Sequence, residues 1–456
     1  MKRLLLLLPI VLCAQVIDTV IHFTDAPAQL LYIPDGNKLY INFPHSYRFL
    51  VLECSTFAIR KVVPYPADYP TAVQGVYNWR KSKIYYGFNI CPESIAVIDN
   101  RTDSIIKWID FDAFQPFSLC YHSRDNKLYA TDGISVAVID CETDSIIKII
   151  NQPYYLSDFV LWDSIGNKVY CGSAWTDKVT VIDCERDTVI KVISTGVSTP
   201  AGAVYNPFRR KVYVGGYWGM RGAVIDAKND TLMKNFPMYW EDDIPLIFNS
   251  LEDKVYWPSI DSLYVMDCAN DSIIKELFVG GLLDMCLASW SNRLYLATMD
   301  HDSISRFTTI YVLDCHTDSI ISKISFGRWG ALIISDYLNQ RIYAAEWRDS
   351  ALYVIRDEIP GVKEECPLPT NYCRPLEIYP NPAKFVMRVR CPWPLKQVQG
   401  DNLALKIFDV SGKLIKEIAT PLVRNDNEVK ISLKGINPGI YFLRFANQTK
   451  KFLVVK

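Results

Sequence analysis

The stretch VIDCETDSIIKII, Val138 to Ile150, recurs as VIDCERDTVIKVI, Val181 to Ile193, which begins 43 residues later. Six clear copies of this phrase align on their first aspartate, at Asp99, Asp140, Asp183, Asp226, Asp267 and Asp314. Two degenerate copies flank them, with Glu53 and Arg356 at the aspartate position. Self-similarity at a nearly constant period is typical of repeat architectures. The chain therefore contains eight related units.

A second phrase occurs once in each unit and consists of a polar turn, a Lys or Arg, an aliphatic residue and a Tyr. Its tyrosines are Tyr40, Tyr85, Tyr129, Tyr170, Tyr213, Tyr256, Tyr295 and Tyr343. A short apolar run, such as AGAVYN at Ala201 to Asn206, precedes each copy. The runs are short, rich in Val, Ile and Tyr, and bounded by turn-forming residues, which favours strands over helices. Each unit is therefore predicted to form four β-strands.

A unit of about 40 to 45 residues with four strands is typical of one blade of a β-propeller, and four to eight blades are usual. The phrases KVYVGG, VTVID and DTVIKVI resemble the YVTN family of β-propeller repeats, over Val16 to Glu358. This resemblance implies the fold and leaves the activity open, because the family includes enzymes, surface-layer proteins and binding scaffolds. We expect an all-β chain with an eight-bladed propeller in residues 15–358.

The eighth unit has three predicted strands and no fourth, since the chain runs from Arg356 into a proline-containing segment. A spare strand stands before the first unit, where DTVI at Asp18 to Ile21 is identical to DTVI at Asp187 to Ile190. We expect Val16 to Phe23 to form the outer strand of the last blade beside Leu352 to Arg356. Such closure would leave no unpaired blade at the ends of the ring.

The first residues have the pattern of a signal peptide. Met1-Lys2-Arg3 is followed by the apolar segment LLLLLPIVLCA, which predicts a signal peptide in residues 1–14. That segment is shorter than the roughly 20 residues that span a bilayer. No other segment is long and apolar enough, so we expect no transmembrane segment in the mature chain.

Charge divides the chain into two parts. Residues 376–456 contain 14 Lys or Arg against 6 Asp or Glu, although the whole chain has a net charge of −1. A basic tail on an acidic body indicates two units with different roles, and the overall charge gives no indication of a nucleic-acid partner. Residues 359–375 form the predicted linker. Their Cys366 and Cys373 are disulfide candidates in an exported protein.

The C-terminal unit, residues 376–456, is predicted to be a small Ig-like β-sandwich. Its runs LEIYPNPA, LKIFDVSGKLIKEI and LKGINPGIYFLRF alternate apolar and polar residues. Turn residues at Ser411-Gly412 and at Asn437 to Gly439 separate the predicted strands.

The same unit resembles the C-terminal (Por-type) sorting domain of the type IX secretion system. The resemblance rests on Tyr379-Pro380-Asn381-Pro382, Asp409 to Leu414 and Gly439-Ile440-Tyr441, in that order. It implies recognition by the secretion machinery, export through the periplasm and across an outer membrane, and release or attachment at the cell surface.

Five cysteines, Cys54, Cys141, Cys184, Cys268 and Cys315, hold one position of the repeat. Packed sheets lie about 10 Å apart and disulfide Cα atoms rarely exceed about 7 Å, so we expect these cysteines to be buried and unpaired. We find no haem, zinc-hydrolase, phosphate-loop or serine-hydrolase motif. The five histidines are scattered over different units, so we expect no metal or cofactor. The first aspartate of the phrase is interpreted as a turn former.

Two functional classes remain open. The favoured class is a non-catalytic surface protein that binds a glycan, another polymer or a protein. The alternative is a propeller enzyme, of the lyase, lactonase or quinone-dependent dehydrogenase type, with its site at the mouth of the channel. Eight-bladed quinone-dependent dehydrogenases usually carry regular tryptophan repeats, whereas the tryptophans of this chain are irregular.

The predicted topology assigns the connections to two faces. Turns between the first and second strands and between the third and fourth strands share one face, and they are short and similar. The remaining loops vary in length and carry large side chains that are typical of binding hot spots. The candidate binding residues are Trp175, Tyr217, Trp218, Arg221, Tyr239, Trp240, Glu241, Asp242, Arg328, Trp329, Glu346, Trp347 and Arg348. Alternatively, these aromatic residues only cover their own blades.

Overall fold

The computed structural model divides the chain into two compact units, residues 1–361 and 362–456. It describes residues 16–66, 72–88, 94–111, 116, 118–216, 221–238, 244–259, 261–299, 307–327 and 330–357 of the first unit. In the second unit it describes residues 377–379, 386–390, 404–409, 414–419, 428–434, 436, 439–445 and 448–454. The described elements are β-strands, apart from one short 3-10 helix at Pro44–Ser46.

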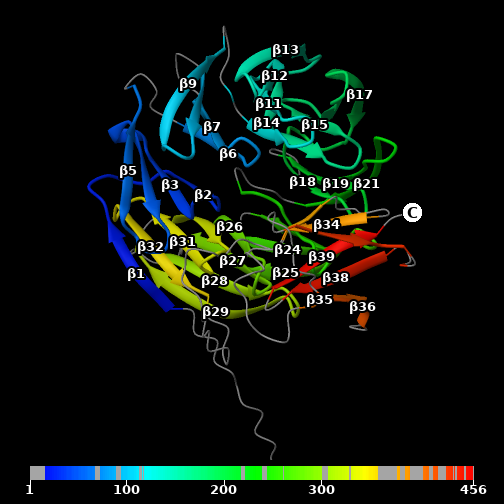
Figure 1. The fold of residues 1–456 in the computed structure, drawn as a ribbon. Helices are drawn as coiled ribbons and strands as arrows, with labels where there is room; N and C mark the ends of the chain where they lie inside the picture. Colours follow the sequence, from blue (N-terminus) through cyan, green and yellow to red (C-terminus); the bar gives the residue numbers. More distant parts are fainter. Residues whose placement is uncertain are drawn as a thin grey trace, which may run out of the picture. The chain divides into compact units, whose positions relative to one another are not determined.

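The first unit is an eight-bladed β-propeller, as predicted: its described strands form eight four-stranded antiparallel sheets (Figure 1). Blades 1 and 2 contain β2 (Gln29–Ile33), β3 (Lys38–Phe43), β4 (Arg48–Glu53), β5 (Ile59–Pro64), β6 (Ala72–Asn78), β7 (Lys83–Phe88), β8 (Ser94–Asp99) and β9 (Ser104–Asp110). Blades 3 and 4 contain β10 (Ser118–His122), β11 (Lys127–Thr131), β12 (Ser135–Asp140), β13 (Ser145–Asn151), β14 (Leu156–Asp163), β15 (Lys168–Ser173), β16 (Lys178–Asp183) and β17 (Thr188–Ser194).

The remaining blades follow the same order. Blades 5 and 6 contain β18 (Pro200–Asn206), β19 (Lys211–Gly216), β20 (Arg221–Asp226), β21 (Thr231–Pro237), β22 (Ile247–Asn249), β23 (Lys254–Pro258), β24 (Ser262–Asp267) and β25 (Ser272–Phe278). Blade 7 contains β26 (Leu282–Ala288), β27 (Arg293–Met299), β28 (Thr308–Asp314) and β29 (Ser319–Phe326). Blade 8 contains β30 (Ala331–Asp336), β31 (Arg341–Glu346), β32 (Ala351–Arg356) and, from the start of the chain, β1 (Val16–His22).

The two repeated phrases lie on adjacent strands of each blade. In blade 3, Tyr129 on the second strand is opposite Val138 on the third strand, and Asp140 is opposite Ser145 on the fourth strand. A β-bulge follows in the fourth strand, because the register shifts between Val138 and Ile139. A bulge adds local twist to its strand, and every blade repeats this one at the same place.

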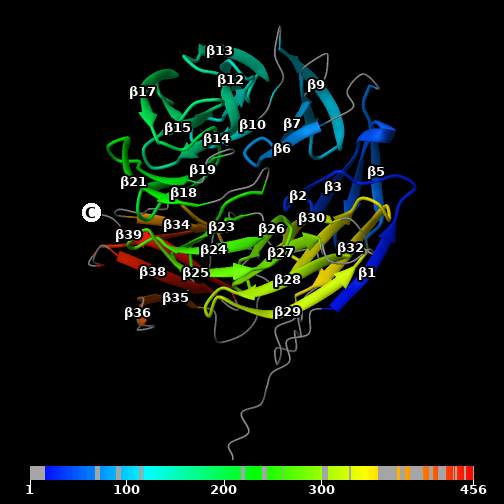
Figure 2. The same ribbon diagram turned by 180° about the vertical axis from the view of Figure 1, so that it is seen from behind.

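Strand β1 pairs antiparallel with β32, from Val16 opposite Arg356 to His22 opposite Ala351. Both ribbon views show the two strands side by side (Figures 1 and 2). The register differs from the one that the DTVI match suggests. In blade 4, Thr188 is opposite Asp183, and Arg356 holds the position of Asp183 in blade 8. The residue opposite Arg356 is Val16, whereas the DTVI match would place Thr19 there. Bulge position and side-chain direction, rather than the identical letters, therefore set the pairing of β1.

The core consists of side chains packed between neighbouring blades. One cluster joins Tyr129 and Val138 of blade 3 to Val169 and Cys171 of blade 4, and all four are buried. The five repeat cysteines (Cys54, Cys141, Cys184, Cys268 and Cys315) are buried and unpaired, as expected. Burial raises the pKa of the Cys141 thiol to about 12, so this thiol stays protonated and packs as a small apolar group. Cys366 and Cys373 lie outside the described residues.

The described strands of the second unit form two antiparallel sheets. One sheet has the order β33 (Glu377–Tyr379), β34 (Val386–Arg390) and β37 (Glu428–Ser432). The other has the order β36 (Leu414–Ala419), β35 (Ala404–Asp409), β38 (Gly439–Phe445) and β39 (Gln448–Val454). Its Ig-like character stays a prediction.

Candidate functional site

The short turns between third and fourth strands have two aspartates with different roles. In blade 3, the Oδ1 atom of Asp140 accepts hydrogen bonds from the backbone N–H groups of Glu142 and Thr143. This carboxylate fixes the turn, as the sequence indicates. The second aspartate, Asp144, has φ 53°, a left-handed conformation that Asp tolerates better than most residues. Its side chain leaves the turn and contacts the preceding blade.

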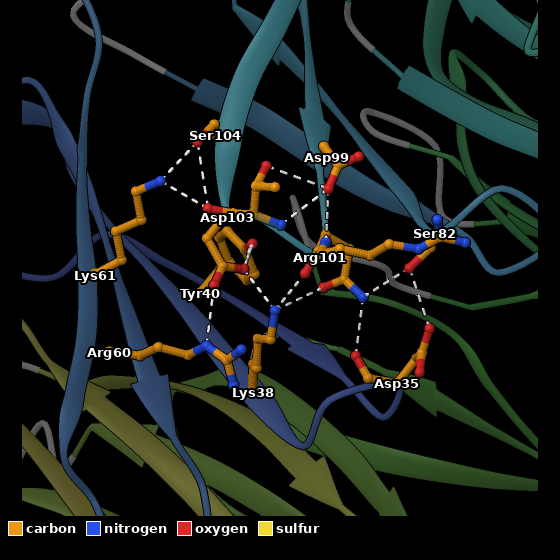
Figure 3. Close-up of polar contacts among 12 residues, drawn as sticks. Asp35, Lys38, Tyr40, Arg60, Lys61, Ser82, Asp99, Arg101, Asp103 and Ser104 are labelled. Atoms are coloured by element: carbon orange, nitrogen blue, oxygen red, sulfur yellow. Dashed lines mark hydrogen bonds and ion pairs between the residues drawn. The ribbon is translucent and has the colours of Figure 1, made fainter.

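We call this contact the clasp: the Lys and Tyr of one blade's second strand meet the second turn aspartate of the next blade (Figure 3). The Nζ atom of Lys127 lies 2.7 Å from Asp187 and also donates to the carbonyl oxygen of Cys184 at 3.1 Å. The hydroxyl of Tyr129 donates to the other oxygen of Asp187 at 2.5 Å. Burial raises the pKa of Tyr129 strongly, and the Asp187 carboxylate adds to the shift, so the phenol stays protonated as a donor.

Six consecutive blade junctions have the complete clasp. Its members are Lys38–Tyr40–Asp103, Lys83–Tyr85–Asp144, Lys127–Tyr129–Asp187, Lys168–Tyr170–Asp230, Lys211–Tyr213–Asp271 and Lys254–Tyr256–Asp318. At the junction of blades 7 and 8, Arg293 pairs instead with Asp357. The clasp therefore explains why two distant phrases repeat together: each unit holds one half of each contact.

The junction of blades 8 and 1 has a different chemistry. Phe57 occupies the left-handed position of the second aspartate, with φ 60°, and the guanidinium of Arg341 lies 4.6 Å from its ring centroid. Arg341 also donates to the carbonyl oxygen of Cys54 at 2.8 Å. In place of a carboxylate from blade 1, two carboxylates of blade 8 itself are used: Asp18 of β1 lies 3.3 Å from Arg341 and 2.5 Å from Arg356, and Asp336 accepts from the hydroxyl of Tyr343 at 3.0 Å. Strand β1 thus supplies a charge as well as backbone pairing.

A second row of lysines on the fourth strands crosses the same junctions. Each donates from Nζ to a backbone carbonyl of the next blade's turn, or of the residue that ends it, at 2.5 to 3.2 Å. The pairs are Lys61–Thr102, Lys107–Thr143, Lys148–Arg186, Lys191–Asn229, Lys234–Asp271 and Lys275–Asp318. Charged side chains on edge strands also discourage pairing with other chains. Lysine, tyrosine and aspartate side chains of the repeated face therefore join neighbouring blades, although Trp79 on the same face is 62% exposed.

The candidate binding residues that the structure describes lie on the opposite face. Eight further candidates lie outside the described residues: Tyr217, Trp218, Tyr239, Trp240, Glu241, Asp242, Arg328 and Trp329. Among the five described candidates, Trp175 is 79% exposed and Trp347 is 56% exposed. Arg221 and Arg348 are also exposed. Exposed tryptophan of this extent is uncommon, since its large apolar surface is normally covered.

Glu346 differs from its neighbours because it is fully buried. Its Oε2 atom accepts a hydrogen bond of 2.5 Å from the backbone N–H of Asp349 and thereby fixes the turn that carries Trp347 and Arg348. This carboxylate is therefore not exposed for a surface ligand, in contrast to the sequence-based expectation. A carboxylate at the end of a strand finds turn donors more readily than the sequence reveals.

Two exposed tyrosines near Trp175 were not identified from the sequence. Tyr154 is 37% and Tyr155 is 65% exposed, in the loop from β13 to β14. The carbonyl oxygen of Tyr155 accepts from the backbone N–H of Ala174 at 2.7 Å, next to Trp175. The sequence signal for them was their place in a loop between blades, on the same predicted face as Trp175. We call Tyr154, Tyr155 and Trp175 the aromatic platform.

The inner surface of the ring holds a different feature, a carboxylate that has no cationic partner among the residues that the structure describes. First strands of successive blades are neighbours, so they line the inside. On β26, Asp284 Oδ2 accepts from the backbone N–H of Ile333 on β30 at 2.8 Å. The side-chain oxygen of Gln74 on β6 likewise accepts a hydrogen bond from the backbone N–H of Leu119 on β10, at 2.7 Å. Burial raises the pKa of Asp284 to about 7, despite two backbone hydrogen bonds that lower it.

We expect Asp284→Asn to flatten the pH dependence of stability. In the unfolded chain this carboxyl ionises near pH 3.8, whereas in the fold it ionises near pH 7. The wild type therefore loses stability as pH rises from about 4 to about 7, because only the unfolded chain gains the charge freely. In thermal melts, the melting temperature of the variant relative to that of the wild type should be higher at pH 8 than at pH 4. An equal difference in melting temperature at both pH values would contradict the raised pKa of Asp284.

Within the part of the chain that the structure describes, no group of three or more His, Cys, Asp or Glu side chains is arranged to hold a metal ion. None of the described helical segments has the length and apolar character needed to span a membrane.

Comparisons with solved structures show the propeller fold. The computationally designed protein Ika8 is 12% identical with a TM-score of 0.57, and the alignment covers 73% of this chain and 96% of that one. BamB from Moraxella catarrhalis is 14% identical with a TM-score of 0.56, over 75% and 100% of the two chains. The dihydro-heme d1 dehydrogenase NirN is 11% identical with a TM-score of 0.57, over 67% of each chain. At these identities the likeness concerns the fold alone.

No curated protein matches the sequence significantly. One family model does match, over residues 377–456, and its description is "Secretion system C-terminal sorting domain". This agrees with the resemblance of residues 376–456, and it implies an interaction with secretion machinery and export to the surface or the medium. The chain thus joins an eight-bladed β-propeller to a secretion system C-terminal sorting domain.

Proposed function

We propose that the protein is exported through the type IX pathway and acts outside the cell as a non-catalytic binding propeller. The signal peptide, residues 1–14, carries the chain to the periplasm, and the sorting domain carries it across the outer membrane. Strand β1 closes the ring, and the propeller presents its varied loops to an extracellular glycan, polymer or protein. The YVTN-like repeats supply the scaffold, and an Ig-like sandwich forms the sorting domain.

The main support for the binding role is the difference between the two faces of the ring. Lysine, tyrosine and aspartate side chains of the repeated face are engaged in contacts between blades. On the other face, Trp175 and Trp347 expose most of their side chains in turns that are fixed by hydrogen bonds. Function usually lies on loops held by a rigid frame, and aromatic residues dominate hot spots. This contrast supports ligand binding at the varied face.

Glycan and peptide arrays probed with the purified mature chain test the binding role. We expect specific signals on at least one array. Absence of signal on both, with a protein that melts cooperatively, would contradict the proposed function.

The export role gives a second prediction. A signal peptide followed by a reporter protein and residues 376–456 should reach the medium or the surface of a cell with a type IX system. The same fusion without residues 376–456 should stop in the periplasm, because the recognised domain is missing. Immunoblots of periplasm, surface and medium measure the distribution. Equal export of the two fusions would show that the C-terminal unit serves another purpose.

A further inference from the structure

The aromatic platform, Tyr154, Tyr155 and Trp175, brings together residues from two separate connections. The two tyrosines belong to the loop between blades 3 and 4, and Trp175 belongs to the turn between β15 and β16. Strands β14, β15 and β17 of blade 4 are labelled in both ribbon views, beside blade 3 with its outer strand β13 (Figures 1 and 2). The exposed fractions are 37%, 65% and 79%, so all three side chains present apolar surface to solvent.

Hydrogen bonds fix the backbone beneath the platform. Trp175 has φ 62°, an unusual conformation for a bulky residue, and its N–H donates to Thr199 Oγ1 at 3.1 Å. The N–H of Thr199 donates in turn to the carbonyl oxygen of Thr176 at 2.7 Å. Hydrogen bonds hold loop 152–155 at both ends. The N–H of Gln152 donates to the carbonyl oxygen of Ile134, and the N–H of Ala174 donates to the carbonyl oxygen of Tyr155. A ligand would therefore meet an ordered backbone and pay little ordering entropy.

The surroundings of the platform are polar but electrically balanced. Segments 152–155, 174–178 and 194–199 contain one acid and one base, Asp177 and Lys178. These two pair with each other at 2.7 Å, and Lys178 also donates to Ser194 Oγ at 2.6 Å. Hydroxyl residues that are at least partly exposed stand in the same segments, at Thr176, Ser194 and Ser198, whereas Thr195 and Thr199 are buried. The site therefore offers aromatic faces and hydroxyl groups without a net charge.

We propose that the aromatic platform binds a neutral polysaccharide, an inference that rests on the proposed binding function. A pyranose ring has an apolar face of C–H groups with partial positive charge, which packs on the electron-rich face of an aromatic ring. Its hydroxyl groups donate to and accept from Ser and Thr hydroxyls. An anionic or cationic polymer would gain little, since Asp177 and Lys178 already neutralise each other.

The size of the platform favours a glycan over a folded protein. Fully covered aromatic side chains bury 150 to 250 Å² each, so three partly exposed rings offer on the order of 400 Å². A stable protein interface needs about 800 Å² on each partner. One or two sugar rings match the smaller area, and a polymer can bind the same site at many positions along its length.

Affinity electrophoresis of the full mature chain tests the proposal, in native gels that contain dextran, yeast mannan or a soluble β-glucan. We expect at least one of these neutral polysaccharides to retard the wild type. Trp175→Asn and Tyr155→Ala should each weaken the retardation about 30-fold in apparent affinity, as hot-spot residues do. Asn is chosen at position 175 because it tolerates the left-handed backbone. Melting temperatures verify that both variants fold.

Trp79→Ala is the matched control. Trp79 is 62% exposed in the turn between β6 and β7, on the repeated face, so its loss should leave the retardation unchanged. No retardation of the wild type, or equal weakening by Trp79→Ala, would overturn the proposal. If the wild type instead binds a peptide array and Trp175→Asn has no effect there, the glycan platform fails while the binding function stands. Binding to neither class contradicts both.

Discussion

Deletion of residues 15–24 is expected to make the propeller aggregate, or to lower its melting temperature by more than about 10 °C. The deletion removes β1 and leaves the edge of β32 without a partner, and unpaired edges associate with other chains. It also removes Asp18, the carboxylate that lies near both Arg341 and Arg356. Two arginines of blade 8 then lose this counter-charge.

Expression in the cytoplasm separates this effect from export, and a chain that lacks only residues 1–14 is the control. Light scattering and thermal melts compare the two proteins. Asp18→Asn keeps the strand and removes only the charge, so it should have a much smaller effect. A deletion variant as stable as the control would show that β1 does not close the ring.

Asp187→Asn is expected to destabilise the propeller by about 3 to 5 kcal/mol, the usual cost of removing one partner from a buried ion pair. Lys127 and Asp187 are 16% and 11% exposed at their side chains, so the ammonium group left behind would be poorly solvated. Asn is tolerated in the left-handed turn conformation at φ 52°, so the backbone itself should not be strained. Urea unfolding at pH 7 measures the change.

The neighbouring aspartate of the same turn provides the control for the clasp. Among the residues that the structure describes, Asp183 accepts from the backbone N–H groups of Glu185 and Arg186 in its own turn, so Asp183→Asn should cost roughly 1 kcal/mol. Adding Lys127→Met to Asp187→Asn should recover part of the loss, because the uncompensated charge is removed. Equal effects of Asp183→Asn and Asp187→Asn would mean that the clasp contributes no more than the turn.

The blade count could be predicted because the information is local and repeated. Each unit carries its own apolar runs and turn residues, and eight copies leave little ambiguity about strand number. The match of residues 377–456 to a sorting domain was equally accessible, since its motifs are contiguous. The candidate site was only partly predictable. Trp175 and Trp347 are exposed on loops that the sequence pattern singles out, whereas Tyr155 is exposed on a loop that the pattern does not single out and Glu346 is buried although the pattern singles it out.

Local sequence sets the number of blades, the four strands of each blade and the role of turn aspartates such as Asp140, because these features depend on residues that are near one another in the chain. The contacts of Asp187 with Lys127, of Asp18 with Arg341 and of Tyr155 with Ala174 become visible only in the folded chain. Such pairs are set by how one twisted sheet packs on the next. That packing is a property of whole blades, and no single segment of the chain encodes it.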